Sequence, residues 1–462
     1  MAIATINPVT GETLKKFDAL TETELDDRLR RASLAFQSYR RTTPAERVGW
    51  LRSAADVLDA DAEHVAVLMT TEMGKTLASA KAEVSKCAYA LRFFASHGPS
   101  YLADDVVDAD AVGAEKAYVV YQPVGVVLAI MPWNFPLWQA MRFAAPALMA
   151  GNVGVLKHAS NVPQTALYLE ELFGKAGFPA DVFQTLLIGS KQVERVLRDN
   201  RVAAATLTGS GPAGQSVAAI AGAEIKKTVL ELGGSDPFLV MPSANLDKAA
   251  EVATTARCQN NGQSCIAAKR FIVHESVGDE FERLFAQKLA ALPIGDPMDG
   301  NTKVGPLATE QGREDVEALV RDAVEKGARV VVGGKRVDGP GWYYPPTLIT
   351  DITKEMRIYR EEVFGPVASL YRVPDFDAGL ALANDTDFGL GSNIWTDDET
   401  ERSRFVREIQ AGMAFVNGMT TSYPEMPFGG VKTSGYGREL TVHGMREFLN
   451  IKSVWIGADS HS

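Results

Sequence analysis

The chain has 462 residues, 46% hydrophobic and 23% charged, so it is long enough for two or three folded domains and leaves little room for a long disordered tract. Its formal charge of -11 would repel a polyphosphate backbone, and no run of Lys and Arg offsets it, which argues against nucleic acid as a partner. No apolar run approaches the roughly 18 residues of a membrane span, and the N-terminus lacks a signal-peptide pattern, so we expect a cytoplasmic protein with no membrane partner.

The first hundred residues carry the periodicity of amphipathic helices. Thr21 followed by Glu24 is a capping-box pattern, which predicts that a helix begins just after Thr21. A second helix is predicted after Thr43, because Thr43 suits the N-cap, Pro44 the first helical position and Glu46 the return bond of a second capping box. These signals describe a scaffold rather than chemistry.

Apolar β-rich runs begin near residue 117, with strands predicted at 118–121 and 126–131 on either side of a turn. Later apolar runs predict strands at 153–156, 183–188 and 203–207, and helical periodicity around 167–172 lies between them. Strands that alternate with helices indicate a parallel α/β sheet.

A second alternating series follows the pair Gly233-Gly234. Its predicted strands are 271–273, 328–332 and 367–371, and its predicted helices are 280–291 and 376–383. No fixed-period repeat or low-complexity linker interrupts the chain, so the glycine-containing break at 233–237 alone marks the start of a second α/β domain.

The three cysteines, Cys87, Cys258 and Cys265, are too few for a disulfide framework and lack metal-binding spacing. The six histidines form no HxH or HxxxH pattern, so we expect no metal site. Cys265 follows a polar segment, Gln259 to Ser264, that is atypical of an apolar core. It is either a reactive thiol or, like the other two cysteines, a buried small side chain.

Glu231 is a single carboxylate between Leu230 and Leu232, at the end of a strand-like run and just before two glycines. Partial desolvation there would raise its pKa toward neutrality and give a base able to activate a thiol or a water. The alternative is a carboxylate held in a surface ion pair.

The segment Leu-Glu-Leu-Gly-Gly-Ser-Asp-Pro at 230–237, followed by Gly-Gln-Ser-Cys at 262–265, resembles the signature pair of the aldehyde dehydrogenase superfamily, with a matching separation of 34 residues between Glu231 and Cys265. Similar segments extend along nearly the whole chain, at 131–136, 208–210, 361–366 and 427–430. The resemblance implies an α/β fold of aldehyde dehydrogenase type, with two Rossmann-like doubly wound α/β domains and a small β oligomerisation arm.

Under this resemblance, residues 1–104 and 122–234 form an NAD(P)-binding domain, and residues 235–445 form a catalytic domain with the nucleophilic cysteine. Residues 105–121 and 446–462 form the oligomerisation arm. Strands of this kind leave unpaired edges, which favour pairing with a second subunit, so we expect a homodimer or a homotetramer.

The resemblance also implies a catalytic set of three residues. The Cys265 thiolate attacks the aldehyde carbon to form a thiohemiacetal, and its oxyanion receives hydrogen bonds from the Asn134 side chain and the Cys265 N–H. Loss of hydride to a nicotinamide leaves a thioester, which is hydrolysed by a water that Glu231 deprotonates.

A dinucleotide site follows from the same resemblance. No GxGxxG fingerprint precedes the helix that opens at Gly209-Ser210, whose N-terminus can accept a pyrophosphate. The expected cofactor-binding residues are Trp133, Asn134, Lys157, His158, Ala159, Ser160, Gly209, Ser210, Leu232, Glu362 and Phe364. We expect NADP rather than NAD, because NAD-preferring members commonly carry glutamate at the position of Ser160, whereas serine can donate to a 2′-phosphate and Lys157 can pair with it.

Within the superfamily, residues 133–139 and 156–159 resemble bacterial succinate-semialdehyde dehydrogenases. This resemblance assigns the substrate carboxylate to Arg142 and Ser422, while Gln259 stands where many such enzymes place a second arginine. Alternatives stay open at this point: a salt-bridged structural Arg142, another aldehyde such as glutarate semialdehyde, and a cysteine acyl hydrolase that uses only Cys265 and Glu231. A catalytically silent protein that keeps the fold is a further alternative, against which the presence of Cys265, Glu231 and Asn134 argues.

Overall fold

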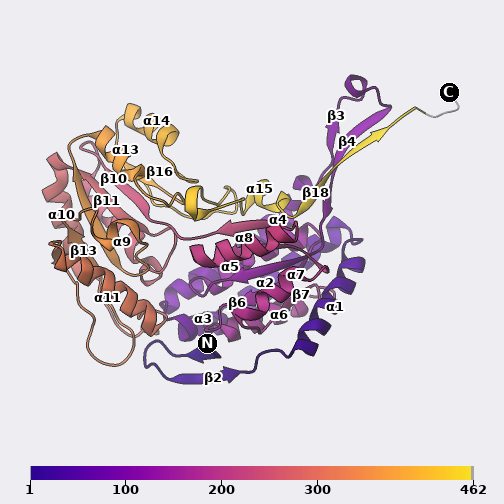
Figure 1. Ribbon diagram of the computed structural model, residues 1–462, viewed down its shortest axis with the longest axis horizontal. Coiled ribbons are helices and arrows are strands. Elements are labelled where there is room, and N and C mark those ends of the chain that lie inside the picture. Colours follow the sequence, from indigo (N-terminus) through magenta and orange to yellow (C-terminus); the bar gives the residue numbers. More distant parts are fainter. Residues whose placement is uncertain (1, 459–462) are drawn as a thin grey trace.

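A six-stranded sheet is the centre of the first of two lobes in the computed structural model, which describes residues 2–458 (Figure 1). The strands lie in the order β17-β9-β8-β5-β6-β7, and all are parallel except the short edge strand β17. Their bounds are β5 Val126–Met131, β6 Val153–His158, β7 Phe183–Thr185, β8 Val202–Thr208, β9 Lys227–Glu231 and β17 Gly435–Tyr436.

Helices connect these strands and cover the sheet. They are α5 Pro136–Met149, α6 Pro163–Lys175, α7 Val193–Arg198 and α8 Gly211–Ala223. Helices α5 and α6 pack against β6, and α7 and α8 pack against β8. The predicted alternation of strand and helix in this region is confirmed, with strand ends that differ by a few residues.

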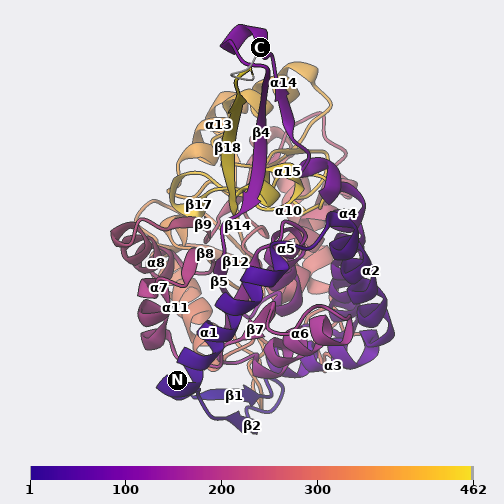
Figure 2. The same ribbon diagram turned by 90° about the vertical axis from the view of Figure 1, so that its right-hand side faces the viewer.

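Four helices precede this sheet: α1 Glu22–Tyr39, α2 Pro44–Ala60, α3 Ala62–Met73 and α4 Leu77–Tyr101. Both predicted capping boxes are present, at Thr21 with Glu24 and at Thr43 with Glu46. Helices α2 and α4 pack side by side along one flank (Figure 2). The expectation that the first hundred residues are helical throughout is wrong at their start. A hairpin of β1 Ile3–Ile6 and β2 Thr13–Phe17 begins the chain, and such short strands give too weak a period to detect.

A seven-stranded sheet is the centre of the second lobe, in the order β12-β13-β14-β11-β10-β15-β16, with only β12 antiparallel. Its strands are β10 Asp236–Val240, β11 Ala268–His274, β12 Arg329–Val332, β13 Thr347–Thr350, β14 Val367–Val373, β15 Asn393–Trp395 and β16 Phe415–Val416. Its helices are α9 Leu246–Cys258, α10 Glu275–Ala290, α11 Glu310–Glu325, α12 Arg357–Arg360, α13 Phe376–Asn384 and α14 Glu399–Glu408. The chain leaves the first sheet at Glu231 and enters the second at Asp236, on either side of the glycine pair.

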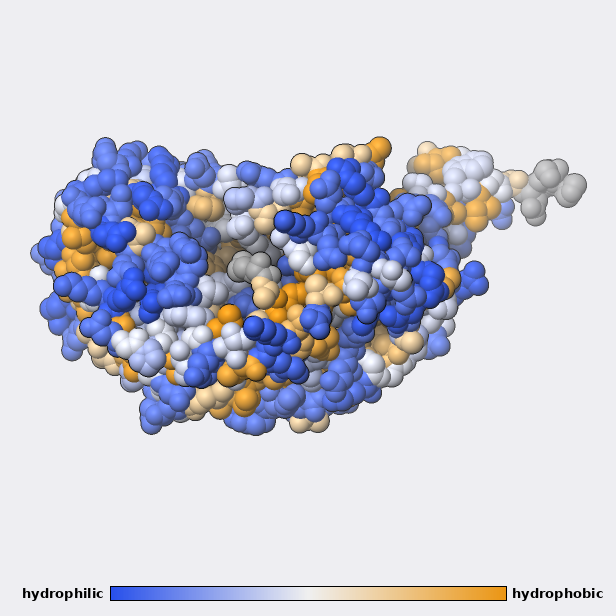
Figure 3. Space-filling model, turned by 60° about the horizontal axis from the view of Figure 1, so that its bottom comes forward, coloured by the Kyte–Doolittle hydropathy of each residue, from blue (hydrophilic) through white to orange (hydrophobic). Residues whose placement is uncertain are grey.

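A three-stranded antiparallel ribbon projects from the first lobe (Figure 1). It consists of β3 Asp105–Val107, β4 Lys116–Pro123 and β18 Leu449–Ile456, which follows helix α15 Thr441–Arg446. We call it the arm. The arm carries hydrophobic residues at its surface, as do several other parts of the face shown in Figure 3. Val106 is 89% exposed and Trp455 59% exposed. Among residues 2–458, no helix combines the length and apolar composition needed to cross a membrane.

Candidate active site

Cys265 lies in the loop between α9 and β11, and unusual backbone geometry shapes this loop. Asn260, Asn261 and Gly262 have φ of 53°, 58° and 75°, so three successive residues adopt the left-handed region. A Cβ on Gly262 would lie 2.3 Å from the carbonyl carbon of Gly365, which leaves space for glycine alone. The Asn261 side chain donates to the carbonyl oxygens of Gly74 at 2.8 Å and Pro306 at 2.9 Å. The loop is therefore tied to both lobes.

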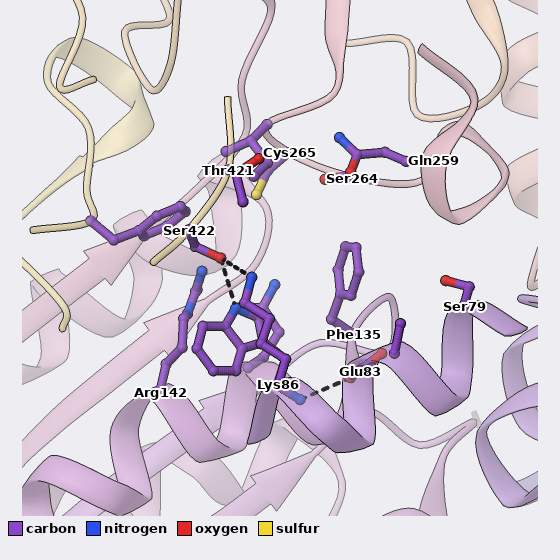
Figure 4. Close-up of a pocket in the computed structure, with 15 residues that line it drawn as sticks. Ser79, Glu83, Lys86, Phe135, Arg142, Gln259, Ser264, Cys265, Thr421 and Ser422 are labelled. Carbon is purple, nitrogen blue, oxygen red and sulfur yellow. Dashed lines mark hydrogen bonds between the residues drawn. The ribbon is translucent and has the colours of Figure 1, made fainter. Parts of the chain in front are cut away.

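Two cavities meet at Cys265. The first, which we call the α4 cavity, has a volume of about 170 Å³ and lies between α4, α5 and the loop of Thr421 and Ser422 (Figure 4). The second, the sheet-edge cavity, lies at the carboxyl ends of β5, β8 and β9 and is lined by Asn134 and Leu232 as well as Cys265. Because Cys265 lines both cavities, a small molecule in the first and a cofactor in the second would meet at this residue.

The Cys265 thiol is held in its neutral form by its surroundings. Burial raises its pKa to about 12, although the charges of Arg142 and Lys269 oppose the shift. Lys269 was not anticipated from the sequence. Its ammonium donates to the carbonyl oxygens of Ser264 at 2.8 Å and Cys265 at 2.7 Å, and pairs with Glu362 at 3.2 Å. This buried lysine connects the cysteine loop to the cavity wall.

Two hydrogen-bond donors lie at the cysteine loop. The Asn134 amide uses one N–H to reach the carbonyl oxygen of Gln263 at 3.1 Å, which leaves its second N–H available. The backbone N–H of Cys265 has no acceptor among residues 2–458. The two donors match the pair that the sequence predicts for an oxyanion.

Glu231 is the last residue of β9, and it is buried with 2% exposure. Neither carboxylate oxygen has a hydrogen-bond partner within the described part of the chain. Burial and the nearby Glu439 carboxylate raise its pKa well above the ordinary value of 4.5. The alternative of a surface ion pair is therefore wrong.

The Glu231 side chain packs over Gly429, where a Cβ would lie 2.7 Å from its Oε1 atom. A side chain at position 429 would therefore collide with Glu231, which explains why this position is glycine. Glu231 is absent from the walls of both cavities at Cys265.

The predicted cofactor residues cluster at the sheet edge with one exception. Gly209, Ser210 and Leu232 line the sheet-edge cavity, and Ser210 is the N-cap of α8. Trp133, Glu362 and Phe364 line it as well and continue into a third cavity, which Lys157, Ala159 and Ser160 border. His158 points elsewhere: its Nε2 meets the Pro136 carbonyl at 2.8 Å and its Nδ1 accepts from the Ala159 N–H, so it holds the turn beneath this wall.

A dinucleotide fits these connected cavities. Buried polar atoms without a partner border them: the Thr208 hydroxyl can donate or accept a hydrogen bond with a ligand, and Asn161 Nδ2 can donate one. The N-terminus of the 13-residue helix α8 also lies at the sheet-edge cavity, where its backbone N–H groups can bind a phosphate. A cysteine acyl hydrolase would have no use for this space.

The three residues predicted to bind a carboxylate all line the α4 cavity. Arg142 is paired through Nε with Glu439 at 2.7 Å, and both side chains are buried. Gln259 Nε2 is buried without a partner. The Ser422 hydroxyl accepts from Lys86 at 2.7 Å and from Trp138 at 3.0 Å, so its own hydrogen is free (Figure 4).

Lys86 and Glu439 were missed because each lies far along the chain from every recognised motif. Lys86 comes from α4, 179 positions before Cys265, and Glu439 lies close to β17. Each appears in the sequence only as a single charged residue, and most single charged residues in a sequence have no role in a functional site.

Comparison with known proteins agrees with this geometry. Residues 1–454 match the model of the aldehyde dehydrogenase family. The chain is 63% identical over 458 residues to the Mycobacterium ulcerans protein named succinate-semialdehyde dehydrogenase [NADP(+)] 1, covering 99% of this chain and 100% of that one. A Mycobacterium avium protein named succinate-semialdehyde dehydrogenase [NADP(+)] is 62% identical over 459 residues, covering 99% and 97% of the two chains.

Among solved structures, a succinic semialdehyde dehydrogenase from Streptococcus pyogenes in complex with NADP+ superimposes with a TM-score of 0.96 at 39% identity, covering 99% of this chain and 100% of that one. The predicted α/β fold of aldehyde dehydrogenase type is thereby confirmed. The chain belongs to the aldehyde dehydrogenase family, as the segments around Glu231 and Cys265 predict.

Proposed function

We propose that this enzyme oxidises succinate semialdehyde to succinate with reduction of NADP. The observation that carries the proposal is the α4 cavity, in which Arg142 and Ser422 form a polar end below Cys265, while Gln259 lines the wall near Ser264 (Figure 4). An aldehyde group at the sulfur and a carboxylate at the polar end would both find partners. The mycobacterial relatives are named for this substrate and cofactor.

Cys265 is the nucleophile in this proposal. Its thiol loses its proton to water, the sulfur attacks the aldehyde carbon, and the resulting oxyanion accepts hydrogen bonds from the Asn134 amide and the Cys265 N–H. When bound along the sheet edge, NADP+ supplies the acceptor for the hydride that this adduct loses. A water then hydrolyses the thioester on Cys265, and Glu231 takes the proton of that water.

The first test is absorbance at 340 nm with succinate semialdehyde, glutarate semialdehyde and acetaldehyde, each supplied with NADP or NAD. We expect the highest kcat/KM with succinate semialdehyde and NADP. A higher value with acetaldehyde would contradict the binding of a substrate carboxylate in the α4 cavity. A higher value with glutarate semialdehyde would show that the substrate is one carbon longer than proposed. Equal rates with NAD would contradict the choice of cofactor.

NADP preference is assigned to Ser160 and Lys157, which border the third cavity. Burial lowers the pKa of Lys157, and within residues 2–458 it has no carboxylate partner, so a 2′-phosphate would supply one. The Ser160 carbonyl oxygen accepts from the Ala4 N–H at 3.0 Å, so the backbone here is held independently of the Ser160 side chain.

Ser160→Glu should lower the preference for NADP over NAD by about 100-fold, since a carboxylate would repel the 2′-phosphate and could bind a ribose hydroxyl. The measurement is the ratio of kcat/KM for the two cofactors. Ser160→Ala is the control, because it removes the hydroxyl without adding charge and should change the ratio only severalfold. An unchanged ratio in Ser160→Glu would contradict this assignment.

A homo-oligomer and a cytoplasmic location complete the proposal. The arm exposes Val106, Ile451 and Trp455, and an edge strand of this kind is protected when it pairs with another subunit. Light scattering should report a dimer or a tetramer, and a monomer would contradict it. The cysteines Cys87, Cys258 and Cys265 are all unpaired, which is typical of a reducing compartment.

A further inference from the structure

The α4 cavity contains two cationic side chains, Lys86 from α4 and Arg142 from α5. Both point toward the Ser422 hydroxyl, below Cys265 (Figure 4). Arg142 and Lys86 differ in whether a carboxylate of the protein balances their charge. The one without such a carboxylate gains more free energy when it binds an anion.

Arg142 already has its counter-ion within the protein. Its Nε lies 2.7 Å from a carboxylate oxygen of Glu439, with side-chain exposures of 2% and 5%. One face of its guanidinium is covered by the Phe428 ring, whose centroid lies 4.2 Å away. A second carboxylate at Arg142 would have to approach a charge that is already compensated.

Lys86 has only neutral partners. Its ammonium donates to the Ser422 hydroxyl at 2.7 Å and lies 4.4 Å from the centroid of the Trp138 ring. No carboxylate in the described part of the chain forms a salt bridge with it. Glu83 lines the same cavity, but it is taken by the Lys75 ammonium and by the backbone N–H groups of residues 137 and 138.

Burial without a counter-ion destabilises the charged form of Lys86, and this lowers its pKa. Burial, with a smaller effect from Arg142, lowers the pKa of Lys86 to about 8, while Glu83 and the Cys87 thiol oppose the shift. A half-buried ammonium without a counter-ion gains more from an anionic ligand than one in solvent does.

We propose that Lys86 binds the far carboxylate of the aldehyde substrate directly, together with the Ser422 hydroxyl, and so takes the place of the arginine that Gln259 replaces. The inference rests on the proposed function. Ser422 accepts hydrogen bonds from Lys86 and Trp138, so its own hydrogen can only point to a further acceptor, and a carboxylate beside Lys86 provides one.

The test is Lys86→Met, which keeps a straight side chain over Trp138 and removes the charge. The KM for succinate semialdehyde should rise about tenfold to hundredfold, the loss expected for a charge-assisted hydrogen bond. The kcat for it should stay within about twofold, and the KM for butanal, a neutral aldehyde of the same length, should not rise. Lys86→Arg should restore most of the affinity for succinate semialdehyde.

Lys81→Met is the matched control. Lys81 lies on the same helix, is exposed, and pairs with Glu63 at 2.6 Å outside the cavity, so its replacement should change neither KM. An equal rise of KM for both aldehydes in Lys86→Met would show a structural role and overturn the proposal.

A pH series tests the same point without relying on a variant that may misfold. In the wild type, the KM for succinate semialdehyde should increase above about pH 8, because the ammonium loses its proton there, while the KM for butanal stays flat. In Lys86→Arg the increase should disappear, since a guanidinium keeps its charge. A KM for succinate semialdehyde that is flat to pH 9.5 would overturn the proposal.

Different results would contradict the proposed function and the role of Lys86. A wild type that does not prefer succinate semialdehyde over butanal contradicts the proposed function itself. A wild type that shows the preference, combined with a Lys86→Met variant that keeps the same KM, contradicts the role of Lys86 alone.

Discussion

Replacing Cys265 with alanine should abolish aldehyde oxidation, with kcat lower by about 10⁴-fold or more, because, of the described residues that line both the α4 cavity and the sheet-edge cavity, Gln139 and Cys265, only Cys265 is a nucleophile. NADP binding, followed by fluorescence or calorimetry, should change little, since the thiol is a single small group at the edge of the second cavity. Retained turnover would remove Cys265 from its proposed role.

Cys258 supplies the control for this experiment. It lies seven positions earlier, is buried in the core of the second lobe, and burial raises the pKa of its thiol to about 12. Cys258→Ala should cost some stability, as a buried truncation does, and leave kcat unchanged. A loss of activity in both variants would point to disruption of the loop rather than to removal of a nucleophile.

Replacing Glu231 with glutamine should lower steady-state turnover by about 100-fold to 10,000-fold, the range for loss of a general base. Attack by Cys265 and loss of hydride need no water, so stopped-flow absorbance should still show a burst of about one NADPH per subunit. A stable thioester should then be detectable by mass spectrometry. A burst that is lost together with turnover would show that Glu231 acts before the thioester forms.

The pH profile of the wild type bears on the same residue. The pKa of Glu231 is raised by burial and by Glu439, so below that pKa the carboxyl holds its proton and cannot accept one from water. Thioester hydrolysis should therefore increase with pH, with an apparent pKa above the ordinary 4.5, and this dependence should vanish in Glu231→Gln. Glu224→Gln, at a surface carboxylate paired with Arg198, should leave both rate and profile unchanged.

Local patterns were sufficient for much of the scaffold. The capping boxes at Thr21 and Thr43 depend on residues three positions apart, so the sequence specifies them completely. The alternation of strands and helices is also indicated by local patterns, because the periodicity of apolar residues differs between the two. The β1–β2 hairpin was missed because its exposed polar strand, β2, has no apolar period.

The candidate site was recovered where it is encoded in contiguous motifs, as around Cys265 and Glu231. It was not recovered where distant segments meet. The Arg142–Glu439 pair joins residues almost 300 positions apart, and nothing near Arg142 in sequence indicates that its charge is already compensated. The ion pair of Lys269 with Glu362 likewise joins residues 93 positions apart, although the contacts of Lys269 with Ser264 and Cys265 are local.

The position of β17 bears on how the protein is made. The strand that ends in Glu231 is completed on one edge by Gly435 and Tyr436, which follow every strand of the second sheet along the chain. Until they emerge from the ribosome, β9 has an open edge and the Glu231 carboxylate lacks the Gly429 segment that packs against it. Under the role proposed for Glu231, we therefore expect nascent chains that stop before Gly429 to fold the parallel strands of the first sheet and yet to hydrolyse no thioester.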